Sequence, residues 1–131
     1  MNFSVISRTF IVLGATGGLL SVALGAFGAH SIKHWMPTDL MTVYQTAVSY
    51  QMYHSLALLI IGLIYHHHDN KLINSAGWLM FSGMFIFSGS LYFLSLSGIR
   101  WLGAITPIGG SLLILSWLLL IFGVLKKQRE P

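Results

Sequence analysis

Four long segments of the chain carry no charged side chain, and they constrain its fold more than any other feature. They cover about residues 10–29, 47–65, 73–96 and 102–125. Each is long enough to cross about 30 Å of hydrocarbon as an α-helix that rises about 1.5 Å per residue. A backbone in lipid must satisfy its own polar groups, which a helix does and an open strand edge does not. The sequence therefore predicts an all-α membrane protein with four transmembrane helices.

The composition supports the same class. Only 8% of the 131 residues are charged, against about 25% in a typical soluble domain. A chain this short cannot hide so many apolar side chains in one soluble core. We therefore predict a single integral membrane domain over residues 1–131, with the lipid bilayer as its partner. The net charge of +4 lies at the termini and in short connections, so no nucleic-acid partner is expected. Cysteine is absent, which excludes disulfides, thiolate chemistry and covalently attached haem.

Residues 30–46 connect the first two spans and are expected to lie in the membrane interface. Pro37 predicts a break in the helix. Thr38 or Asp39 can then cap a helix that begins near Leu40 and continues into the second span. Two aromatic side chains of the segment are expected at headgroup depth, Trp35 and Tyr44. The later connections are short, so consecutive helices should be antiparallel neighbours.

Basic residues predict the orientation, because cytoplasmic loops are enriched in Lys and Arg. Four spans place both termini on one side. The basic residues of that side are Arg8, Lys71, Lys126, Lys127 and Arg129, and those of the other side are Lys33 and Arg100. Five against two favours both termini in the cytoplasm, with the protein in the plasma (inner) membrane. The histidine loop at residues 66–68 would then be cytoplasmic as well.

Small residues recur along the spans, which predicts close helix packing because lipid offers no hydrophobic drive between helices. The first span carries Gly14, Gly18, Ser21, Gly25 and Gly28. The third carries Ser75, Ser82 and Gly89 beside Ala76, Gly83 and Ser90, and the fourth carries Gly109, Gly110, Ser116 and Gly123. The second offers Ser55 and Gly62. A spacing near 3.5 residues predicts a compact bundle with left-handed crossings.

Polar residues form a second pattern. In a bundle of four antiparallel spans they would lie together in the half away from the termini, which is the outer-leaflet half in this orientation. The candidate cluster is His30, Tyr50, Gln51, His54, Ser88, Ser90, Tyr92, Thr106 and Pro107. The expected partners of His54 are Ser88, Ser90, Tyr92, Thr106 and His30. Pro107 has no amide hydrogen, so the carbonyl of Gly103 should be free to bind Gln51 or Tyr50. The cluster is either an interhelical hydrogen-bond network or a ligand site.

The stretches GAFGAH, YQMYH, FSGSLY and TPIGG carry a family resemblance. In this order they resemble the small membrane proteins of the YgdD and YwdK family, a domain of unknown function (DUF423, uncharacterised protein family 0382). The family is bacterial and includes a eukaryotic small transmembrane relative. The likeness extends from about Gly14 to Gly110. It implies a multi-pass plasma-membrane protein, and it supplies no activity, substrate or catalytic residue.

Three classes of function remain open. We expect a structural or accessory protein without a cofactor, acting as a homo-oligomer or beside a membrane protein partner. The alternative is a binder or carrier of a small ligand, haem or metal through His54 and His30, with the loop histidines as a weaker metal pattern. The least supported class is an intramembrane hydrolase with His54 as base and Ser88 or Ser90 as nucleophile. The acids all lie outside the spans, at Asp39, Asp69 and Glu130, so we expect no enzyme.

Overall fold

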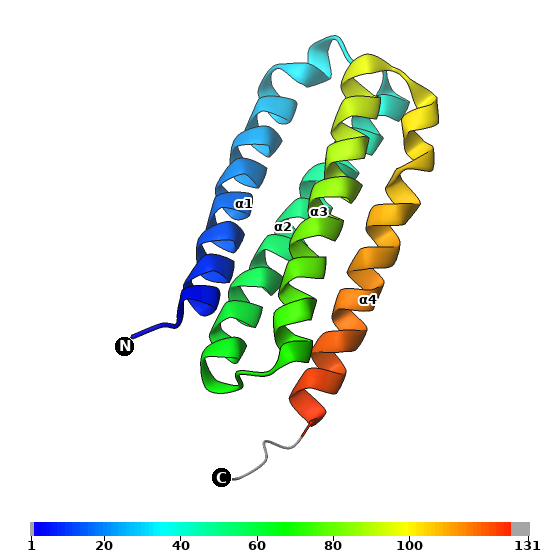
Figure 1. The fold of residues 1–131 in the computed structure, drawn as a ribbon. Coiled ribbons are helices and arrows are strands. Elements are labelled where there is room, and N and C mark those ends of the chain that lie inside the picture. The colour runs from blue at the N-terminus through cyan, green and yellow to red at the C-terminus, as the bar shows by residue number, and fades with distance from the viewer. Residues whose placement is uncertain (1, 127–131) are drawn as a thin grey trace, which may run out of the picture.

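The computed structural model describes residues 2–126, and four long helices dominate that part of the chain. They are α1 (Val5–His30), α2 (Thr38–His67), α3 (Lys71–Ser97) and α4 (Thr106–Leu125). Two 3₁₀ turns, η1 (Ile32–His34) and η2 (Arg100–Ala104), lie in the connections. The helices run alternately up and down, so α1 begins at the end of the molecule where α4 stops (Figure 1). All four are long and apolar enough to cross a membrane, which confirms the predicted all-α class.

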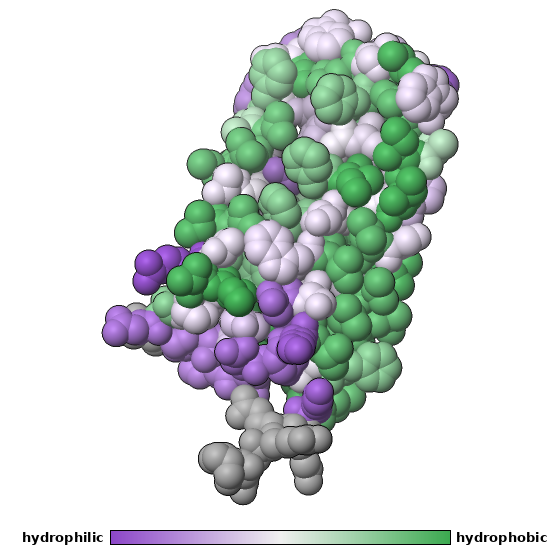
Figure 2. Space-filling model, viewed as in Figure 1, coloured by the Kyte–Doolittle hydropathy of each residue, from purple (hydrophilic) through white to green (hydrophobic). Residues whose placement is uncertain are grey.

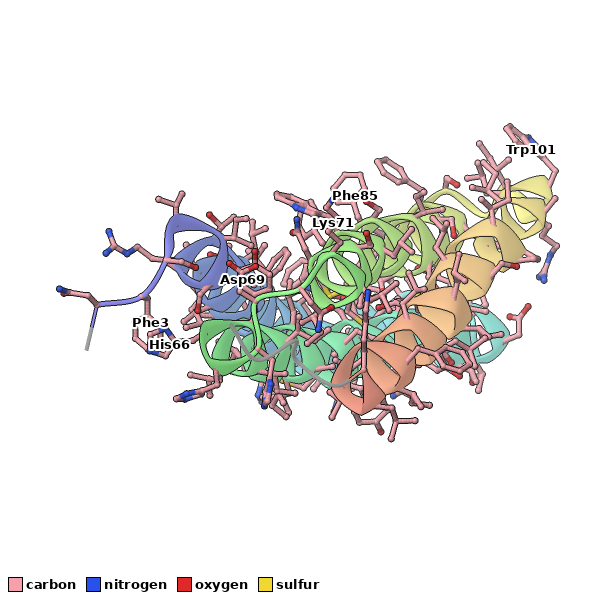
Figure 3. The ribbon with its side chains drawn as sticks, turned by 60° about the horizontal axis from the view of Figure 1, so that its bottom comes forward. Phe3, His66, Asp69, Lys71, Phe85 and Trp101 are labelled. Atoms are coloured by element: carbon pink, nitrogen blue, oxygen red, sulfur yellow. The ribbon has the colours of Figure 1, made fainter. Side chains whose placement is uncertain are left out.

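The surface agrees with this assignment. On the face shown in Figure 2, hydrophobic residues cover most of the length of the bundle, and hydrophilic residues gather at the end that carries the termini. Phe3 lies against His66 at this end, with ring centroids 4.7 Å apart, while Trp101 lies at the far end (Figure 3). Of the basic residues that predict the orientation, Lys127 and Arg129 lie outside the described residues.

The first connection differs from the prediction in two respects. The helix α2 begins at Thr38, directly after Pro37, and no side chain caps it. Tyr44 points into the bundle and is only 1% exposed, and its hydroxyl donates a 2.6 Å hydrogen bond to the carbonyl of Leu24. The tyrosine turns inward because Gly28 of α1 leaves space for its ring. Trp35, by contrast, is exposed.

In the fourth span, which covers Arg100–Leu125, the α-helix begins several residues after the start of the span. Residues 100–104 form η2, and α4 begins at Thr106 with Pro107 in its first turn. A proline in the first turn lacks an amide hydrogen that would have no partner within the helix anyway. Pro107 therefore starts a helix rather than freeing the Gly103 carbonyl inside one, and the predicted contact of that carbonyl with Gln51 is wrong. Gln51 instead bonds to Gly17 and Tyr92.

Small residues set the close contacts between helices, although on partly different faces from those predicted. A Cβ at Gly14 would lie 2.7 Å from the Ser55 carbonyl oxygen of α2. Close approaches also occur between Gly83 and Gly109 across α3 and α4, between Gly28 and Tyr44, and between Gly25 and Val48. The Ser21 hydroxyl donates a 2.8 Å hydrogen bond to the Val48 carbonyl. A Cβ at Gly110 would meet only the Phe87 ring, at 3.7 Å. Two predicted packing positions, Gly18 and Gly89, have no heavy atom within 4 Å of a Cβ, so they do not pack against another helix.

The helices pack in the order of the chain, α1 on α2, α2 on α3, and α3 on α4. Among the described residues, α1 and α4 form no packed pair, and α1 meets α3 at only a few positions. An exposed ion pair between Asp39 and Arg100 (2.5 Å) joins the start of α2 to η2 at the far end. The sparse contact between α1 and α3 leaves space beside the middle of α2, and the candidate site occupies that space.

Candidate functional site

Gln51 links three helices in the middle of the bundle. It is the fourteenth of the thirty residues of α2 and only 8% exposed. Its amide nitrogen donates to the carbonyl of Gly17 on α1 over 2.9 Å. Its amide oxygen accepts a 2.6 Å hydrogen bond from the Tyr92 hydroxyl on α3. The amide therefore lies across the space between α1 and α3 and holds them at a fixed separation.

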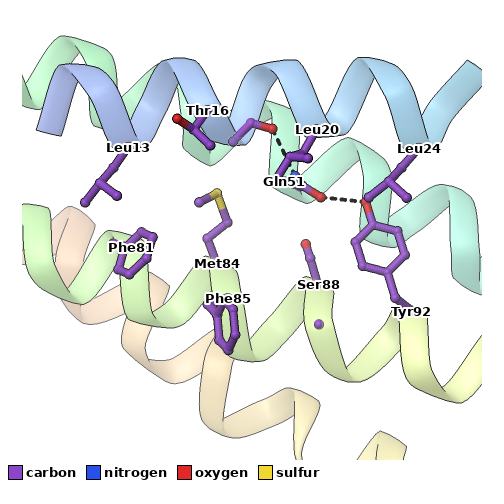
Figure 4. A pocket seen from close by; sticks show the side chains of 12 residues that line it. Leu13, Thr16, Leu20, Leu24, Gln51, Phe81, Met84, Phe85, Ser88 and Tyr92 are labelled. Atoms are coloured by element: carbon purple, nitrogen blue, oxygen red, sulfur yellow. Dashed lines mark hydrogen bonds between the residues drawn. The ribbon is translucent and has the colours of Figure 1, made fainter.

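A groove of about 390 Å³ opens between α1 and α3, with Gln51 on its floor (Figure 4). Its α1 wall consists of Leu13, Thr16, Gly17, Leu20 and Leu24. Its α3 wall consists of Phe81, Met84, Phe85, Ser88, Gly89 and Tyr92. None of these lining residues is charged. The groove lies within the membrane-spanning part of the helices, and polar groups approach it mainly where Gln51, Tyr92 and Ser88 meet (Figure 4).

His54 belongs to a separate contact between α2 and α4. Its Nδ1 lies 2.7 Å from the Tyr50 carbonyl oxygen, and its Nε2 lies 3.4 Å from the indole nitrogen of Trp117. A carbonyl only accepts and an indole N–H only donates, so Nδ1 carries the hydrogen and Nε2 does not. This arrangement is that of a neutral imidazole, with a protein group beside each ring nitrogen of His54.

The structure divides the predicted polar cluster into small groups. Gln51 and Tyr92 form the network of the groove, whereas Ser90 bonds to Thr106 over 2.7 Å. Tyr50 is partly exposed and stacks on Phe87 with ring centroids 4.4 Å apart. The predicted partners of His54 are wrong, because its ring meets Trp117 on α4 instead.

The structure does not assemble the metal, haem or hydrolase site considered from the sequence. His30 is exposed at the end of α1, whereas both ring nitrogens of His54 lie within hydrogen-bonding distance of protein groups. Within residues 2–126, no group of three His, Asp or Glu side chains could hold a metal, the loop histidines at 66–68 included. Ser88 donates to the Ala47 carbonyl over 2.8 Å, so neither it nor Ser90 bonds to His54 as a nucleophile would.

Sequence reasoning missed three residues that shape these contacts. Gly17 supplies the carbonyl that orients Gln51, and Met84 forms part of the groove wall. Trp117 supplies the partner of His54. Only the tryptophan carries a signal in the sequence, since an indole N–H inside a lipid-spanning segment needs a hydrogen-bond acceptor.

The fold and the apolar, uncharged groove define a small four-span membrane protein. Residues 24–110 match the family described as "Protein of unknown function (DUF423)", and the chain belongs to this family. It is 50% identical to a "UPF0382 membrane protein" of Staphylococcus epidermidis over 119 residues, covering 91% of this chain and 97% of the relative. It is 44% identical to the "UPF0382 membrane protein YwdK" of Bacillus subtilis over 124 residues, covering 91% and 98%. No solved structure matches the chain.

Proposed function

We propose that this protein is a non-catalytic lipid-binding protein that holds one apolar chain of a membrane-dissolved molecule in the groove between α1 and α3. The observation that carries the proposal is the groove itself, an uncharged and mainly apolar hollow inside the span of four membrane-crossing helices. A hollow at this depth faces hydrocarbon rather than water, so the chain of a lipid-like molecule is the available occupant.

The length and volume of the groove fit a single extended chain. Beside α1 the groove runs from Leu13 to Leu24, which is about 16 Å at a rise of about 1.5 Å per residue. Over that length the groove has a volume of about 390 Å³, so it is long and narrow. The volume also falls in the range of roughly 300–1,000 Å³ that is typical of small-ligand pockets.

Two glycines supply a matched pair of variants for the test. Both Gly89 and Gly18 have open space where a side chain would begin, so both accept one without a backbone clash. Gly89 lines the groove and Gly18 does not. Gly89→Leu should therefore fill the groove, while Gly18→Leu adds the same side chain elsewhere on a membrane-spanning helix.

The experiment uses the purified protein in phosphatidylcholine vesicles with a hexadecane chain that carries a terminal diazirine. On illumination, the wild type and Gly18→Leu should show saturable labelling that unlabelled hexadecane competes away. Gly89→Leu should lose most of that saturable labelling. Equal saturable labelling of all three proteins, or none in the wild type, contradicts the proposal and leaves an accessory role as the better account.

We also propose that both termini face the cytoplasm of the cell that makes the protein, in its plasma membrane. The excess of basic residues at the terminal end supports this orientation. Because the chain has no cysteine, the variants Asn2→Cys and Ser97→Cys each carry a single thiol, one at either end of the bundle. A membrane-impermeant maleimide should label Ser97→Cys in intact cells and Asn2→Cys only after permeabilisation. The reverse pattern would show the opposite orientation.

A further inference from the structure

The amide of Gln51 carries a hydrogen-bond donor that the protein does not use. A glutamine amide has two N–H groups, and one of those of Gln51 binds the Gly17 carbonyl. The second N–H has no hydrogen-bond partner among the described residues. Gln51 is more than nine-tenths buried, and it lines the groove, so the amide group with the unused donor lies beside the groove.

We infer that this free N–H recognises an uncharged carbonyl oxygen on the chain that occupies the groove, an inference that rests on the proposed function. Buried N–H groups in proteins almost always have a hydrogen-bond partner. An N–H is a donor, so the ligand group that pairs with it must be an acceptor. It is uncharged, because no charged side chain lines the groove and an unpaired charge in hydrocarbon is costly.

The neighbours of Gln51 fix the direction of its amide. The Gly17 carbonyl only accepts, so the nitrogen faces α1, and the Tyr92 hydroxyl donates to the oxygen on the α3 side (Figure 4). An amide held by two helices keeps its free N–H in place before any ligand arrives. Such pre-organisation lowers the entropy cost of binding.

The depth of Gln51 narrows the chemical class further. Gln51 lies thirteen residues beyond Thr38, at the start of α2, which is about 20 Å along the helix. Its partner Gly17 is the thirteenth of the 26 residues of α1, so Gln51 lies near the mid-length of two helices that can cross a hydrocarbon layer about 30 Å thick. The ester of a phospholipid lies at the edge of that layer and would not reach this amide. The structure therefore favours a neutral molecule without a headgroup, with a ketone or quinone type of carbonyl on an alkyl or isoprenoid chain.

The test compares two photoactivatable probes of equal length in the same vesicles. One is the diazirine-bearing hexadecane used above, and the other carries an added ketone at mid-chain. The wild type should take up the ketone at least about threefold more strongly, a ratio typical of one hydrogen bond inside a membrane protein. The readout is the ratio of ketone labelling to hexadecane labelling in each protein. Gln51→Leu should lower this ratio to about one, while Gly18→Leu, which lies outside the groove, should keep the ratio of the wild type.

A second measurement does not depend on any variant. The infrared carbonyl band of the ¹³C-labelled ketone should shift to lower frequency when the wild type binds it, as expected for a hydrogen-bonded carbonyl. Equal uptake of the two probes by the wild type, an unshifted band, or a preference that survives in Gln51→Leu would overturn the inference. Absence of saturable labelling by both probes would instead contradict the proposed function.

Discussion

Helices α1 and α3 meet in two different ways along their length, and the difference explains why the bundle has a groove. Near the termini, the ring of Phe10 on α1 packs directly over Gly77 of α3. About two turns further along, α1 presents Gly17 instead of a large side chain, and the Gln51 amide spans the space. A large side chain over a glycine closes the first region. A polar side chain between two separated helices keeps the second region open.

The closed region should be the more sensitive to the loss of a side chain. Phe10 is fully buried and packs edge-on against Trp78, with ring centroids 5.4 Å apart. Phe10→Ala should lower the free energy of unfolding by about 3–5 kcal/mol, since it removes a buried aromatic ring and leaves a cavity. Denaturant titration in mild detergent measures the change. The exposed Val12 of the same helix supplies the control, and a similar loss in Val12→Ala would contradict this packing.

The contact of Gly14 with α2 should have a smaller effect on the free energy of unfolding than the packing of Phe10. Gly14→Ala would place a Cβ 2.7 Å from the Ser55 carbonyl oxygen and 2.8 Å from the Leu59 amide nitrogen. Both atoms belong to the backbone of α2, so the helices must separate, and we expect a loss of about 1–3 kcal/mol in the free energy of unfolding. Gly18→Ala has no heavy atom to meet and should unfold like the wild type. Equal stability of the two variants would show that α1 and α2 are not in this register.

In the open region, loss of one hydrogen bond should lower the free energy of unfolding less than either substitution above. Tyr92→Phe removes the donor to the Gln51 oxygen and keeps the ring that packs against Tyr44. The expected cost is about 0.6 kcal/mol, the average for one interhelical hydrogen bond in a membrane protein. Thermal unfolding of both proteins in the same detergent checks this value. A loss as large as that of Phe10→Ala would mean that the network, rather than close packing, dominates stability.

The sequence was a good guide to the spans and a poorer one to their faces. Uncharged runs suffice to locate four membrane helices, because charge in hydrocarbon is costly. It is harder to predict which side of a helix faces its neighbour. Gly17 and Gly18 are adjacent in sequence, and only Gly17 contacts α2. The predicted cluster contained Gln51 and Tyr92, but it joined them to His54. The carbonyl of Gly17 and the separation of α1 from α3 depend on helix rotation and spacing, which no residue pattern in the chain specifies.

Two methionines of α3 provide the most direct test of the central claim that a membrane-dissolved chain enters between α1 and α3. Met84 lines the groove and Met80 lies in the closed core, and both are almost wholly buried, at 6% and 0% exposure. The measurement is residue-resolved mass spectrometry of the wild type after labelling with the diazirine-bearing hexadecane. We predict saturable adducts at Met84 and none at Met80. Adducts at both residues to the same extent, or at neither, would contradict the account.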